Sequence, residues 1–151
     1  MSTGKGNSRR AFTLVEILIV VIILGILAAI IIPQFANASS DARTTNLKTT
    51  LANVRSQIEM FKAQHNESAP GLVGMWTLMT GLSDTTEVNV AAPTGSHWGP
   101  YLQAAPLNPM NMKTGISSTA TDTDAGWYYA PAGLGFTFFA RNPDGSINTA
   151  F

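Results

Sequence analysis

The most informative segment of the chain is RRAFTLVEILIVVIILGILAAIIIPQF, residues 9–35. No charged residue occurs at positions 17–40, a run long enough to cross about 30 Å of hydrocarbon as a helix. One carboxylate, Glu16, stands at the start of this apolar run. An unpaired carboxylate is costly in hydrocarbon, and ionisable residues inside membrane segments are usually functional. The sequence therefore predicts a membrane helix whose single acid needs a partner.

Charge is unevenly distributed along the 151 residues. Lys5, Arg9 and Arg10 precede the apolar run, whereas all nine acidic residues follow Phe12. This asymmetry predicts that the N-terminal end stays in the cytoplasm while the rest of the chain crosses the membrane. The formal net charge is zero with 12% charged residues, so we expect no nucleic-acid binding. The chain has no cysteine, which excludes disulfides and thiol chemistry.

Two ordinary interpretations of the apolar run compete with a more specific one. A plain single-pass anchor accounts for the length but leaves Glu16 without a purpose. A secretory signal peptide cleaved after Ala38 fits the small residues Ala36 and Ala38, and would release a secreted binding domain. The apolar stretch is longer than the ~7–15 residues of a signal peptide, and Glu16 interrupts its beginning.

The third interpretation supplies a partner for Glu16. A cut immediately before Phe12 creates an α-amino group with a pKa of about 8, which is largely protonated at neutral pH. Within one helix this amine is poorly placed to meet the carboxylate, but between staggered subunits it can meet Glu16 of a neighbour. A buried ion pair adds little net stability, whereas an unmatched partner costs several kcal/mol. The pair would therefore set the register of subunits.

The residues around the predicted cut carry a family resemblance. Arg10-Ala11-Phe12-Thr13-Leu14-Val15-Glu16 resembles the processing site of type IV prepilins and type II secretion pseudopilins. The resemblance implies cleavage between Ala11 and Phe12 by a membrane-embedded prepilin peptidase, N-methylation of Phe12, and a role for Glu16 in assembly. The family usually has glycine before the cut. Because alanine is the next smallest residue, we expect slower or unchanged processing.

The helix is predicted to continue beyond the membrane, from about position 12 to position 64. Gly25 and Pro33 are weak points, and the resemblance implies that the helix bends or partly melts there in a filament. The alternative is that Pro33 ends the helix. Past Pro33, apolar residues at steps of four and three predict a stripe that packs on the protein's own sheet. The stripe consists of Leu47, Leu51, Val54, Ile58 and Phe61.

Polar residues flank this stripe and the end of the helix. Arg55 and Glu59 are four positions apart, which predicts a solvated ion pair. His65 stands at the C-terminus of the helix, where we expect a surface residue that interacts with the helix dipole. Turn-forming residues at 65–71 then end the helix.

The remainder of the chain predicts a short helix, a long loop and a β-hairpin. The short helix is expected at 76–82, and a variable surface loop at 83–126. Aromatic segments at 126–131 and 136–140, joined by a turn, predict a hairpin that packs on the helix stripe. A turn at 142–145 and a short last strand within 146–151 follow. Segments 98–102, 106–109 and 126–131 resemble the major, G-type pseudopilin of type II secretion.

Metal binding and catalysis are weakly supported. G-type pseudopilins generally bind calcium through acidic loops near the C-terminus, but this chain offers only Asp144 there and the pair Asp122 and Asp124 before Gly126. Calcium needs six to eight oxygens, so backbone carbonyls and water would have to complete the shell. We therefore prefer a solvated loop and no cofactor. His65 and His97, the only histidines, lack metal-ligand spacing, and no enzyme activity is expected.

Together these features predict a type IV pilin-like α+β fold, with one long N-terminal helix against a small C-terminal antiparallel sheet. The expected regions are a removed leader (1–11), a transmembrane and polymerisation helix (12–36), its amphipathic continuation (37–65) and a periplasmic globular region (66–151). The resemblance implies a structural subunit of a type II secretion pseudopilus, single-pass in the bacterial inner membrane, that drives protein export. Its implied partners are further copies of itself, minor pseudopilins, prepilin peptidase, the inner-membrane assembly platform and the lipid bilayer.

Two alternatives for the function stay open at this point. One is a type IV pilin or competence-type pilin that serves adhesion, motility or DNA uptake. The other is the secreted binding domain released by cleavage after Ala38.

Overall fold

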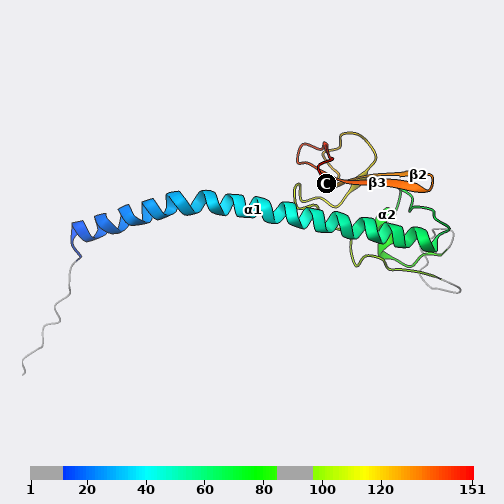
Figure 1. The fold of residues 1–151 in the computed structure, drawn as a ribbon, viewed down its shortest axis with the longest axis horizontal. Helices are drawn as coiled ribbons and strands as arrows, with labels where there is room; N and C mark the ends of the chain where they lie inside the picture. Colours follow the sequence, from blue (N-terminus) through cyan, green and yellow to red (C-terminus); the bar gives the residue numbers. More distant parts are fainter. Residues whose placement is uncertain (1–11, 85–96) are drawn as a thin grey trace, which may run out of the picture. The chain divides into compact units, whose positions relative to one another are not determined.

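The computed structural model describes residues 12–84 and 97–151. The chain forms two compact units, Met1–Ser40 and Asp41–Phe151, and we call the second the globular unit. Two helices and four strands make up the described chain (Figure 1). They are α1 (Leu14–Gln64), α2 (Met75–Thr80), β1 (Ile116–Ser117), β2 (Trp127–Ala132), β3 (Gly135–Arg141) and β4 (Ile147–Asn148).

Helix α1 has defined start and stop signals. The Thr13 hydroxyl oxygen accepts a hydrogen bond from the Glu16 N–H at 3.2 Å, which caps the first turn. At the other end, Asn66 and Glu67 adopt left-handed backbone conformations, and the Glu67 N–H bonds to the Lys62 carbonyl at 2.8 Å. The helix is assigned without interruption through Pro33. The predicted helix over about 12–64 is therefore confirmed, and the alternative that Pro33 ends it is wrong.

The core of the globular unit is built on the predicted apolar stripe. All five stripe residues are buried, and they form one cluster with residues of α2, β2 and β3. The aromatic members of the cluster include Trp127, Tyr129 and Phe138, and the rings of Trp127 and Phe138 stack with centroids 5.3 Å apart. The prediction that an aromatic hairpin packs on the stripe is confirmed.

The sheet has the strand order β1-β2-β3-β4. Strands β2 and β3 form the predicted hairpin, with Trp127 opposite Ala140 and Ala132 opposite Gly135. Gly133, at a φ of 57°, turns the chain between them. Strand β4 pairs antiparallel with β3, whereas β1 pairs parallel with β2. The α+β pilin-like fold is confirmed, and the sheet is mixed because the two-residue β1 adds a parallel edge.

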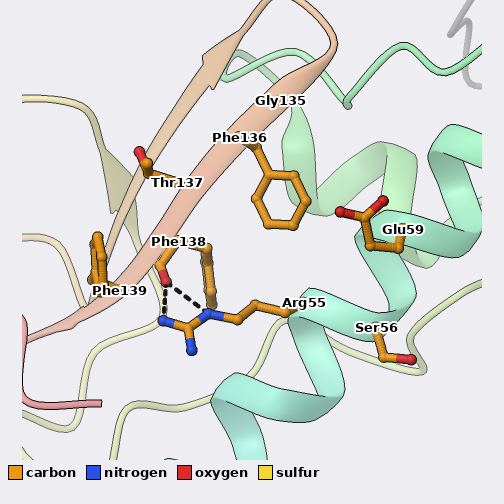
Figure 2. A pocket seen from close by; sticks show the side chains of 8 residues that line it. All are labelled: Arg55, Ser56, Glu59, Gly135, Phe136, Thr137, Phe138 and Phe139. Carbon is orange, nitrogen blue, oxygen red and sulfur yellow. Dashed lines mark hydrogen bonds between the residues drawn. The ribbon is translucent and has the colours of Figure 1, made fainter.

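The expected ion pair between Arg55 and Glu59 is wrong. Arg55 instead donates from Nε and Nη2 to the Phe138 carbonyl oxygen, at 3.1 and 2.7 Å, across an open pocket between α1 and β3 (Figure 2). Its Nη2 also donates to the main-chain oxygen of Phe151 at 3.1 Å. Glu59 accepts from Lys62 at 3.0 Å. Arg55 thus joins α1 to the sheet because a half-buried carbonyl needs a donor more than a solvated carboxylate does.

The expected surface position of His65 is also wrong. His65 is only 1% exposed, and its ring stacks on Phe61 with centroids 3.8 Å apart. Its Nδ1 lies 2.8 Å from the Phe61 carbonyl oxygen, one helical turn back. The buried stripe therefore extends one turn further than its apolar residues indicate.

The described residues between α2 and the hairpin, 81–84 and 97–126, are largely irregular, as predicted for this part of the loop. Helix α2 ends at Thr80, with Gly81 as its C-cap, slightly earlier than expected. Ser83 and Trp98 form an isolated β-bridge that brings the chain back toward α2. Residues 85–96 of the predicted loop lie outside the described residues.

Candidate functional site

The first unit presents an apolar helix with no cover. Every residue at 12–40 is exposed, including Phe12 at 76% and Leu14 at 82%. The apolar side chains occupy all sides of this part of α1 rather than one stripe. A helix that is apolar all round is stable only within a membrane or among other apolar surfaces. The most apolar 18-residue window of α1 has a mean hydropathy of 3.3 and no buried residue, so its length and composition suit a membrane crossing.

Two of the predicted site residues, Phe12 and Glu16, lie at the start of this helix. Phe12 lies just before the helix, and Glu16 stands in its first turn with its side chain exposed. Thr13 was missed by the sequence reasoning, although Thr13-x-x-Glu16 matches the capping-box pattern of a helix N-terminus. Ala11, on the other side of the predicted cut, lies outside the described residues.

The two predicted weak points lie within the helix. Gly25 is exposed, and a Cβ added there would meet nothing within 4 Å. Pro33 lacks the N–H that an α-helix would use, so one backbone bond is missing at that turn. A kink at these positions stays a prediction.

The second candidate, the carboxylate pair at 122 and 124, forms a turn. The Asp122 carboxylate accepts the Asp124 N–H at 2.9 Å; this bond, together with one from Ser117, lowers the pKa of Asp122 below its usual value. The Asp124 carboxylate is 97% exposed and lies 3.4 Å from the Lys113 ammonium. Within the described residues, no three Asp, Glu, His or Cys side chains gather in a way that could hold a metal.

Gly126, which completes the D-x-D-x-G pattern, has a packing role. A Cβ added to this buried residue would lie 2.0 Å from the Lys113 carbonyl oxygen, so no other residue fits. Its own carbonyl accepts from the buried Asn108 side chain at 2.6 Å, and the same amide donates to the Arg141 carbonyl at 2.8 Å. The glycine therefore serves the close approach of loop 106–113 to the sheet.

Comparisons with known proteins place this chain among relatives with a similar N-terminus. A family model described as a prokaryotic N-terminal methylation motif matches residues 6–32. The type II secretion system core protein G of Pseudomonas aeruginosa is 31% identical over 105 residues, which cover 68% of this chain and 69% of that protein. The core protein G of Klebsiella michiganensis is 26% identical over 70% of each chain.

A pilin is also among the relatives. The type IV major fimbrial protein FimA of Dichelobacter nodosus is 34% identical over 90 residues, 58% of this chain and 57% of that protein. No solved structure matches the chain. The methylation motif at the start of the apolar helix and the match to core protein G over two thirds of both chains show that this chain belongs to the family of G-like pseudopilins and type IV pilins.

Proposed function

We propose that the chain is a structural, non-catalytic subunit of a type II secretion pseudopilus, anchored in the bacterial inner membrane with its globular region in the periplasm. The observation that supports this most is the fully exposed apolar helix at 12–40, which needs either lipid or neighbouring helices around it. Lipid surrounds the helix before assembly and the helices of other subunits surround it afterwards, so the helix passes from one apolar environment to another.

The proposed division of the chain follows from this role. Residues 1–11 form a leader that prepilin peptidase removes, and Phe12 becomes the N-methylated first residue. Residues 12–36 span the membrane and later form the polymerisation helix, with flexible points at Gly25 and Pro33. Residues 37–65 continue the helix as an amphipathic segment, and residues 66–151 form most of the periplasmic region.

Assembly is proposed to depend on Glu16. In the isolated chain its carboxylate is exposed beside apolar residues, which suits an acid that is matched only in the filament. The protonated amine of Phe12 on an incoming subunit would neutralise it there. The proposed partners are further copies of the chain, minor pseudopilins and the inner-membrane assembly platform.

Mass spectrometry of the protein from its native membrane tests the processing step. We expect a chain that begins with methylated Phe12. A chain that keeps its first eleven residues in working filaments would contradict the proposal. A chain that begins at Ser39 would favour the secreted binding domain instead.

A type IV pilin is the second candidate, favoured by the 34% identity to a major fimbrial protein. Deletion of the gene in the native bacterium separates the two. Loss of export of secreted proteins, with surface pili intact, supports the pseudopilin. Loss of surface pili, adhesion, motility or DNA uptake, with export intact, supports the pilin.

A further inference from the structure

The last residue of β3 is a fully buried arginine. Arg141 is 0% exposed, and its neighbour Ala140 is buried in the core that contains the helix stripe. Because successive side chains of a strand point to opposite faces, Arg141 lies on the other face of the sheet. A buried arginine needs partners for its charge and its N–H donors, and within the described residues the Nε of Arg141 has none, so its partners are all reached through Nη1 and Nη2.

The partners of Arg141 are backbone carbonyls from two separate loops. Its Nη1 donates to the Gly145 carbonyl oxygen at 2.6 Å, and its Nη2 donates to the Thr119 carbonyl oxygen at 2.5 Å. Two longer contacts, each 3.4 Å, reach the carbonyl oxygens of Ala120 and Ser117. The guanidinium therefore stands at the meeting point of segments 117–120 and 142–146.

Burial disfavours the charged form of Arg141, and two of its neighbours partly offset this cost. The Tyr128 ring lies 5.7 Å from the guanidinium carbon, where a ring face attracts a cation. Burial lowers the pKa of Arg141, while the charge of the Asp122 carboxylate partly opposes that shift. Because an arginine guanidinium loses its proton only under strongly basic conditions, Arg141 stays protonated at neutral pH.

The two loops are in direct backbone contact above the guanidinium. The Asp122 N–H donates to the Gly145 carbonyl oxygen at 3.1 Å, and Thr121 and Ser146 form a β-bridge. Gly145 has a φ of 82°, and a Cβ added there would lie 2.7 Å from the carbonyl carbon of Asp122. The Gly145 carbonyl thus serves both the loop contact and the arginine.

The calcium that the G-type resemblance implies does not fit this region. A calcium ion would need backbone carbonyls to complete its shell, and the carbonyls that converge here already accept hydrogen bonds from Arg141. Asp124 is turned to solvent beside Lys113, and Asp144 accepts from the N–H and the hydroxyl of Ser146. A divalent ion beside a buried guanidinium would also be strongly repelled.

We propose that Arg141 supplies, as a cation built into the chain, the positive charge that holds segments 117–124 and 142–146 together, so that these loops close without a bound calcium ion. The carbonyl oxygens of Thr119 and Gly145, which are suitable ligands for a hard cation, accept hydrogen bonds from the guanidinium instead. The proposal concerns the globular unit alone, and it holds whichever filament the chain builds.

The test is thermal unfolding of the full chain in detergent, followed by tryptophan fluorescence with EGTA or with millimolar CaCl2. Trp76, Trp98 and Trp127 all lie in the globular unit, so the signal reports on it. We expect the wild-type Tm to agree within about 1 °C in the two buffers, since a ligand that does not bind cannot stabilise. A calcium-dependent rise of several degrees would overturn the proposal.

Substitutions at Arg141 provide a second, independent test of the proposal. Arg141→Met should lower Tm by about 10 °C or more, because the Thr119 carbonyl loses its arginine donor and the Gly145 carbonyl keeps only the Asp122 N–H. Arg141→Lys, which keeps the charge but loses the two-pronged donor, should unfold between this variant and the wild type. Arg43→Met removes an exposed arginine on α1 as the matched control and should shift Tm by less than about 2 °C.

An Arg141→Met chain as stable as the wild type would overturn the proposal. If that variant does not fold, the wild-type calcium comparison and Arg141→Lys still decide.

Discussion

At the scale of single residues, Glu16 has two separable roles. It stands in the first turn of α1, where an acid interacts favourably with the helix dipole by about 0.3–1 kcal/mol. Its N–H also bonds to Thr13 as part of the cap. These local effects are small, and they do not explain why a carboxylate is kept at the start of a helix apolar enough to cross a membrane. The proposed ion pair with the terminal amine of a neighbouring subunit explains it.

Replacement of Glu16 by valine or by glutamine should distinguish these roles. Glutamine keeps the size and the capping-box chemistry but removes the charge. We expect both variants to insert in the membrane and to be cleaved nearly normally, and neither to form filaments. Membrane fractionation, mass spectrometry and electron microscopy of sheared filaments provide the three measurements.

Thr13→Ala serves as the control for the local role. Loss of the cap costs about 1 kcal/mol of helix stability, which lipid and neighbouring helices can offset, so its filaments should persist. Normal filaments from Glu16→Gln would show that the charge does not set the register of subunits.

The positions of functional residues were predictable where a short local sequence pattern contains them. Phe12 and Glu16 belong to a short motif at a fixed distance from the apolar run, and they can be found from sequence alone. The burial of Arg141 cannot be found in this way, because one of its two closest partners, the Thr119 carbonyl, is 22 positions away along the chain. His65 was misplaced for a similar reason: the aromatic ring of Trp98, 5.4 Å from its own, comes from a distant segment.

At the scale of elements, the second half of α1 is stabilised by one face only. Ile58 lies on the buried stripe, whereas Met60, two residues further, is about half exposed. Ile58→Ala should lower the free energy of unfolding by about 2–5 kcal/mol through lost burial and the cavity it leaves. Met60→Ala should change it by less than about 0.5 kcal/mol. Urea titration followed by tryptophan fluorescence measures both values, and equal losses would contradict the assigned packing face.

The C-terminal loops predict a dependence of stability on pH. Hydrogen bonds lower the pKa of Asp122 and of Asp144, the first mainly through the Asp124 N–H and the second through Ser146. A carboxylate whose folded pKa is below its unfolded value of about 3.9 stabilises the fold above that pH. This stability is lost as the pH falls through the lowered values.

We therefore expect the urea midpoint of the wild type to fall between about pH 5 and pH 2, with a weaker fall in the double variant Asp122→Asn and Asp144→Asn. Asp41→Asn, which removes an exposed carboxylate on α1, accounts for the general effect of one fewer acid. An equally steep fall in the double variant would show that other groups govern the acid sensitivity.

The elements themselves were predictable to different degrees. The second half of the long helix was found from its sustained helical period, and the hairpin was found from two aromatic segments joined by a turn. Strand β1 was not predicted, since it has two residues and pairs parallel with the start of β2 about ten positions later. A pairing of that length leaves no pattern in the sequence.

At the scale of the whole molecule, the two units differ in what their sequences can bury. Within the part of the chain that the structure describes, the buried apolar residues all lie at position 47 or later, while every residue at 12–40 is exposed. The α+β fold was predictable from this division, because a stripe in one half of a helix and an all-round apolar surface in the other require different surroundings. The mixture of parallel and antiparallel strands in the sheet was not predictable, since it depends on contacts between distant loops.

The division predicts that residues 41–151 fold without the first unit. The stripe that begins at Leu47, the hairpin and the loops around Arg141 are all contained in this part of the chain. A chain that starts at Asp41 should therefore stay soluble without detergent and unfold cooperatively in urea, whereas the full chain should need detergent because its exposed apolar helix associates in water. Size-exclusion chromatography and urea titration with tryptophan fluorescence check both statements. Aggregation of the shortened chain, or a full chain that remains monomeric in plain buffer, would mean that residues 12–40 are covered by the protein itself, and the argument for lipid and neighbouring subunits would lose its physical basis.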